Sequence, residues 1–183
     1  MTSPDRRPRR GFTLVESAIV LATLLVLIGG AATDFSRSLA TAALKAQTAE
    51  FMAALRFARA ESVKRGERVT VCASDPSAAR PACLRPGSAD WRGGWLVFVD
   101  RGERERLDPG DQVLRRQAAV SRSGGIPGTR AALSYTAAGF TTDAAAHFRF
   151  LPPGPAITGV SARLVCVSKQ GRARVAREAA CDS

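Results

Sequence analysis

Glu16 is the residue whose chemistry stands out first, because it is a carboxylate inside an apolar run. The segment Gly11-Phe12-Thr13-Leu14-Val15-Glu16 continues without another charge up to Asp34. A carboxylate in a membrane segment costs a few kcal/mol unless it has a partner, and such residues are usually functional. We therefore take Glu16 as a candidate pairing group. The alternative is a carboxylate at the level of the lipid headgroups, near the helix end.

A short basic leader precedes this apolar run. Residues 1–10 contain four arginines and one aspartate, and Gly11 stands directly before Phe12. A secretory signal has its small-residue cleavage site after the apolar segment, so that the segment is lost. Here the small residue comes before the apolar run. This order predicts removal of the leader 1–11 and retention of the helix that follows.

A second group of candidate residues lies near the C-terminus, where Arg172 and Arg174 are two positions apart. Residues two apart on a strand share a face, so both guanidiniums point the same way, about 7 Å apart. This spacing matches successive phosphates of a nucleic-acid strand, which each guanidinium can bind bidentately. The alternative is a solvated basic edge strand, whose charges discourage aggregation. The neighbouring candidates are Lys169, Gly171, Arg163 and Arg177.

The four cysteines, Cys72, Cys83, Cys166 and Cys181, form an even set. In a domain outside the inner membrane, such a set indicates disulfides. Three connectivities are open, of which the local pairs Cys72–Cys83 and Cys166–Cys181 are the simplest. A zinc site is the rival interpretation, but the sequence has no Cys-x-x-Cys and a single histidine, His147.

Catalytic chemistry is not predicted. The chain has no Ser/His or Cys/His pairing and no glycine-rich phosphate loop, so we expect neither an enzyme nor a cofactor. His147 alternates with Phe148 and Phe150, which is typical of a histidine on a strand surface. Residues 100–108 resemble a calcium loop, but arginines stand where oxygen ligands belong, so no metal is expected.

The charge of the chain is strongly basic, at +11. Removing residues 1–11 leaves 172 residues, enough for one domain after a membrane segment, with a charge of about +8. This excess must lie on the exported domain, where it favours polyanionic partners. The alternative is that the arginine-rich composition reflects a GC-rich genome.

The pattern of residues divides the chain into a helical and a β part. Residues 12–33 are long and apolar enough to cross a bilayer, and the basic leader places the N-terminus in the cytoplasm. Helical spacing continues over residues 34–66 as an amphipathic half and stops at Lys64-Arg65-Gly66. Residues 67–183 read as an antiparallel β domain, which makes the fold α+β. Its predicted strands are 68–73, 94–100, 112–116, 132–137, 147–151, 162–168 and 172–176.

The N-terminal motif closely resembles the prepilin-peptidase site of type IV pilins and type II secretion pseudopilins. The resemblance implies cleavage between Gly11 and Phe12, N-methylation of Phe12, and pairing of Glu16 with the N-terminal amine of a neighbouring subunit. The segments 58–66, 91–100 and 111–115 look like the FimT/GspH branch of minor pilins and pseudopilins. The implied fold is type IV pilin-like: a long N-terminal helix packed on antiparallel sheet.

Gly171-Arg172-Ala173-Arg174 resembles the Gly-Arg-x-Arg motif that the FimT branch uses for DNA. The resemblance implies a minor type IV pilin that captures double-stranded DNA in natural transformation. The alternative is a structural pseudopilin of a type II secretion system without DNA binding. Either protein would sit in the inner membrane with its C-terminal domain in the periplasm. It would then enter a fibre with other pilins, at or near the tip for the DNA-binding pilin.

Overall fold

The computed structural model describes residues 12–121, 123–142, 145–154, 159–176 and 181, with the backbone alone over 25–34. The chain divides into two compact units, Met1–Ser36 and Arg37–Ser183. One helix, α1 (Leu14–Arg65), belongs to both. The predicted leader 1–11, with Gly11, lies outside the described residues.

Both ends of α1 have the signals that its sequence predicts. At the start, the Thr13 hydroxyl accepts a hydrogen bond from the backbone N–H of Glu16 at 3.2 Å, as an N-cap does. At the end, Lys64 and Arg65 occupy the last turn, and Gly66 follows with a φ of 66°. A glycine in this left-handed conformation is the usual residue just past a helix. The predicted helix, about Thr13 to Arg65, is therefore confirmed.

The membrane span predicted for residues 12–33 stays a prediction. No helix among the described residues combines the length and apolar character that crossing a membrane requires. The side chains of residues 25–34, which belong to the predicted span, are not among those described. Outside this gap, Leu14, Ile19 and Leu24 are exposed.

Among the described residues seven strands follow α1, and each predicted strand is present with its ends within two residues. They form two antiparallel sheets, of order β3-β2-β1-β4 and β5-β6-β7. A short 3₁₀ helix, η1 (Trp91–Gly93), leads into β2. The strands are β1 (Val69–Ala73), β2 (Trp95–Val99), β3 (Gln112–Gln117), β4 (Ala132–Tyr135), β5 (Ala146–Phe150), β6 (Arg163–Val167) and β7 (Ala173–Ala176).

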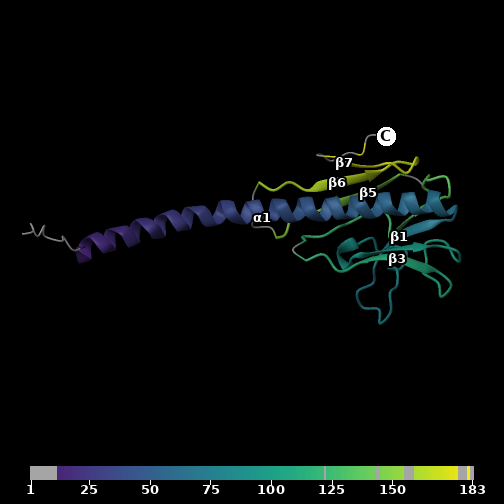
Figure 1. Cartoon of the computed structure of the whole chain (residues 1–183), viewed down its shortest axis with the longest axis horizontal. Coiled ribbons are helices and arrows are strands. Elements are labelled where there is room, and N and C mark those ends of the chain that lie inside the picture. Colours follow the sequence, from purple (N-terminus) through teal and green to yellow (C-terminus); the bar gives the residue numbers. More distant parts are fainter. Residues whose placement is uncertain (1–11, 122, 143–144, 155–158, 177–180, 182–183) are drawn as a thin grey trace, which may run out of the picture. The chain divides into compact units, whose positions relative to one another are not determined.

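The second half of α1 lies between the two sheets and supplies the centre of the core. Figure 1 shows β5, β6 and β7 on one side of this half and β1 and β3 on the other. Phe51 of α1 is fully buried and meets the rings of Trp91, Trp95 and Phe148 at 4.9–5.3 Å in edge-on geometry. Such aromatic pairs stabilise a core beyond the area they bury. The predicted α+β arrangement, a long N-terminal helix packed on antiparallel sheet, is confirmed.

Two local disulfides join Cys72 to Cys83 and Cys166 to Cys181, the simplest of the three predicted connectivities. The first fastens the segment after β1 to the sheet. Cys72 itself is buried with Leu96 and Phe98 on the face of the sheet that is turned away from α1. Its bond therefore anchors an otherwise long loop, Ser74–Asp90, to a rigid strand.

We expect loss of the Cys72–Cys83 disulfide to lower the free energy of unfolding by about 3 kcal/mol in the chain-entropy model. The variant carries alanine at both positions, so that no free thiol or buried hydroxyl is introduced. Urea unfolding of the oxidised protein, followed by circular dichroism, measures the change. An unfolding midpoint equal to that of the unchanged protein would contradict this prediction.

Candidate nucleic-acid interface

The sheet β5-β6-β7 has one face toward the core and one face away from it. On β5, Phe148 and Phe150 are buried, whereas His147 and Arg149, which alternate with them, are exposed. The register continues this division across the sheet, because His147 pairs with Cys166 and Cys166 pairs with Arg174. His147, Arg149 and Arg174 therefore share the outer face. Arg172 lies two residues before Arg174 and so belongs to the same face. We call this face the basic face.

A tight turn, residues 168–172, joins β6 to β7 and presents Lys169 and Arg172 to solvent. Its backbone is closed by bonds from the Ser168 N–H to the Arg172 carbonyl (3.0 Å) and from the Gly171 N–H to the Ser168 carbonyl (2.8 Å). Gly171 is buried and has a φ of 74°, a conformation that L side chains rarely adopt. A Cβ at this position would lie 2.2 Å from the Gly139 carbonyl oxygen. The glycine of the predicted Gly-Arg-x-Arg segment is thus required by the fold.

The turn packs against α1 and against the segment after β4, and hydrogen bonds connect these parts. Arg59 of α1 donates from Nε to the Gly139 carbonyl at 2.9 Å, and the Thr141 N–H donates to the Lys169 carbonyl at 3.0 Å. Tyr135 is buried beside them, and this burial raises the pKa of its phenol. The positions of Lys169 and Arg172 are therefore fixed through backbone contacts, while both side chains stay exposed.

Gly171→Ala is expected to displace this turn, because its new Cβ collides with backbone that Arg59 holds in place. The collision and the positive φ together should cost about 1–3 kcal/mol of stability. Thermal unfolding measures this loss, and Gly110→Ala is the matched control because nothing lies within 4 Å of a Cβ there. Equal unfolding temperatures for the two variants would show that the turn is not confined as described.

The second disulfide lies on the basic face. Cys166 is buried in the middle of β6, in the row between His147 and Arg174. Its bond to Cys181 keeps that C-terminal residue against this row, with 5.6 Å between the two Cα atoms. The disulfide therefore fixes the end of the chain beside the strand that carries Arg174.

Several cations near the first sheet are paired with carboxylates, whereas Arg115 and Arg116 of β3 make no ion pair among the described residues. The pKa values of Glu61 and Glu67 are held below their usual range by hydrogen bonds from Arg65 and Arg101. These arginines are thus engaged within the protein. The described ion pairs of this part are Lys64 and Arg65 with Glu61, Arg68 with Asp100, Arg92 with Asp90, Arg101 with Glu67, and Arg106 with Glu103 and Asp108.

The second sheet has no comparable acidic partners of its own. Residues 146–176 contain five lysines and arginines and no aspartate or glutamate. Among the described residues, the side chains of Arg149, Lys169 and Arg172 make no hydrogen bond or ion pair, whereas Arg174 has a partner. This sheet therefore presents positive charge that the sheet itself does not neutralise.

The structure brings together most, but not all, of the predicted interface. Lys169, Gly171, Arg172 and Arg174 lie on one turn and the strand that follows it. Arg163 does not join them, because it begins β6 at the end far from the turn and pairs with Phe150. Arg177 lies outside the described residues. Arg149 was missed by sequence reasoning, since only the strand order puts β5 in the same sheet as β7.

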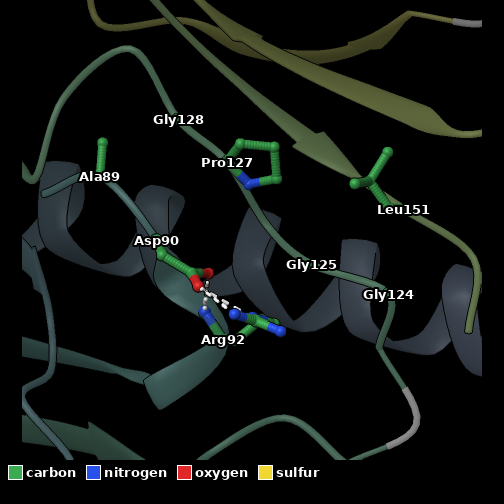
Figure 2. A pocket seen from close by; sticks show the side chains of 8 residues that line it. All are labelled: Ala89, Asp90, Arg92, Gly124, Gly125, Pro127, Gly128 and Leu151. Atoms are coloured by element: carbon green, nitrogen blue, oxygen red, sulfur yellow. Dashed lines mark hydrogen bonds and ion pairs between the residues drawn. The ribbon is translucent and has the colours of Figure 1, made fainter.

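Other parts of the described structure offer weaker candidates. The described residues hold no group of three or more potential metal ligands. A hollow lined by Pro127, Gly128 and Leu151 lies beside Arg92, but Figure 2 shows that the guanidinium there is bonded to Asp90. Phe12, the predicted N-methylation residue just before α1, and Glu16, the predicted assembly residue in its first turn, are both exposed.

A long N-terminal helix packed on antiparallel sheets is a pilin-like architecture, and the comparisons with known proteins agree with it. The family model described as type II transport protein GspH matches residues 47–176. The chain therefore belongs to the GspH family of minor pilins and pseudopilins. A comparison with curated proteins gave no match.

The similar solved structures are two crystal forms of the type IV minor pilin FimU from Pseudomonas aeruginosa strain PAO1. The P21 form is 19% identical, with a TM-score of 0.53, and the alignment covers 76% of this chain and 90% of FimU. The P65 form is 18% identical, with a TM-score of 0.50, over 74% and 90% of the two chains. At this identity the likeness supports the fold.

Proposed function

We propose that this protein is a minor type IV pilin that binds extracellular double-stranded DNA without sequence preference during natural transformation. The observation that carries the proposal is the basic face of the second sheet, which has Arg172, Arg174 and Lys169 at one end and no acidic residue between 146 and 176. Phosphate contacts by arginine and lysine provide affinity that does not depend on base sequence.

Most of the positive charge of the mature chain lies in the C-terminal part of the sequence, which contains the whole second sheet together with β3 and β4 of the first. Residues 112–183 contain ten lysines and arginines against three acidic residues. They therefore carry about +7 of the mature charge of about +8. A duplex meeting the basic face would release counterions from its phosphates, which favours binding at low salt.

Processing and assembly would follow the pilin pattern. In this proposal, prepilin peptidase cleaves between Gly11 and Phe12 at the cytoplasmic side, and Phe12 becomes N-methylated. The helix 12–33 anchors the chain in the inner membrane, with residues 67–183 in the periplasm. Glu16 then pairs with the N-terminal amine of a neighbouring subunit, a pairing that offsets the cost of a carboxylate in lipid. The protein enters the pilus with other pilins, at or near its tip.

A structural role in type II secretion is the second candidate, because the matching family model is described as a type II transport protein. In that role the protein would help to build a pseudopilus and bind no DNA. The N-terminal features serve both functions equally, so the basic face is what separates them.

The test is a titration of fluorescent duplexes with the full chain in uncharged detergent. We expect two duplexes of unrelated sequence to bind equally, with dissociation constants of about 10⁻⁴–10⁻⁶ M. Affinity should fall steeply as salt rises. No binding at low salt would contradict DNA capture and leave the secretion role as the better account.

A further inference from the structure

We infer that the DNA surface spans the whole second sheet, with Arg149 of β5 contacting one backbone of a duplex while Arg172 and Arg174 contact the other. This inference rests on the proposed function. It adds Arg149 to the DNA-binding residues and selects double-stranded over single-stranded DNA. Its experimental test can fail while the proposed function still holds.

The register gives the position of Arg149 relative to the arginines of the β7 edge. Arg149 pairs with Leu164 on β6, and Leu164 pairs with Ala176 on β7. Neighbouring strands are about 4.8 Å apart, so β5 and β7 are separated by about 10 Å. Arg149 is also two residues, or about 7 Å, away from the row of Arg174 along the strand direction. It thus lies well to the side of the line from Arg172 to Arg174.

This offset matters for the kind of nucleic acid that fits. A backbone that follows Arg172 and Arg174 along β7 runs parallel to the strand and leaves Arg149 without a phosphate. A duplex supplies a second backbone across its minor groove, which is about 6 Å wide. The arginine backbones on β5 and β7 are about 10 Å apart, and their long, flexible side chains can lean inward to reach the two sides of such a groove.

The backbone of Arg149 is held in the sheet, whereas its guanidinium is exposed to solvent. Its backbone is bonded on both sides, because β5 pairs with β6 and the Arg149 N–H donates to the Pro127 carbonyl at 2.9 Å. The flanking Phe148 and Phe150 are fully buried in the core. Among the described residues its exposed guanidinium makes no hydrogen bond or ion pair. A phosphate contact here needs no rearrangement of the sheet.

The experiment compares Arg149→Gln with Arg116→Gln in the full chain, in uncharged detergent. Arg116 is an exposed strand residue of the other sheet, so its variant removes the same charge elsewhere. Each variant is titrated with a duplex and with a single strand of equal length. We expect Arg149→Gln to weaken duplex binding about three- to tenfold and to lower the salt slope by about one unit. Single-strand binding should stay unchanged, and Arg116→Gln should change neither.

Two results would overturn the inference while leaving the proposed function intact. In the first, Arg149→Gln behaves like Arg116→Gln although replacing Arg172 and Arg174 weakens duplex binding at least about tenfold. In the second, Arg149→Gln weakens single-strand and duplex binding equally. A wild-type chain that binds neither nucleic acid would overturn the inference and the proposed function together.

Discussion

Replacing Arg172 and Arg174 together with glutamine is expected to weaken duplex binding at least about tenfold at low salt. The slope of log K against log salt should fall by about two units, because about two phosphate contacts are lost. Both side chains are exposed, and glutamine keeps much of their length, so stability should change little. Fluorescence anisotropy at several salt concentrations measures affinity and slope together.

The matched control removes the same charge from the loop between β2 and β3. Arg104 is exposed there, and Arg106 is paired with Glu103 at 2.9 Å. The double variant Arg104→Gln, Arg106→Gln should leave the salt slope close to that of the unchanged protein. Equal losses from both double variants would mean that net charge alone governs binding. The secretion role would then be the better account.

Gly11→Leu should leave the basic leader attached to nearly all of the protein. The physical reason is that a peptidase must approach the backbone closely at the scissile bond, and a bulky side chain prevents this approach. Mass spectrometry of membrane extracts distinguishes the two forms, and the unchanged protein should begin at a methylated Phe12. A mature mass for the Gly11→Leu protein would contradict the proposed cleavage site.

Glu16→Ala separates assembly from processing. Its leader should be removed normally, because the cleavage site is intact, and mass spectrometry of the same extracts verifies this. The mature protein should nevertheless be absent from sheared fibres, since the partner of the neighbouring amine is missing. Detection of the variant in the fibre fraction at the wild-type level would show that Glu16 has no role in assembly.

Local sequence patterns were sufficient to predict the helix and the strands of this chain. The long helix ends where cations and Gly66 follow each other, a continuous apolar run located β2, and alternation of apolar and polar residues located β5. These signals depend on neighbours within a few residues, so they can be read without the fold. The turn before Arg172 could be predicted for the same reason.

Which residues share the interface depends on strand order and long-range contacts, and local sequence patterns do not reveal either. Nothing local indicates that β5 joins β6 and β7 in a sheet separate from β1. Arg149 therefore looked like one strand residue among several, and Arg163 looked closer to the turn than its register allows. The contact of Gly171 with Gly139 links residues far apart in the chain, and only the packed structure reveals it.

The most direct test of DNA binding by the basic face is an NMR titration of the arginine side chains with duplex DNA. Assigned Nε–Hε signals report each guanidinium separately, in the full chain in uncharged detergent. We predict saturable shifts for Arg172 and Arg174, reversed by added salt, with little change at Arg104 and Arg106. Shifts of equal size at all four arginines, or none at Arg172 and Arg174, would contradict it.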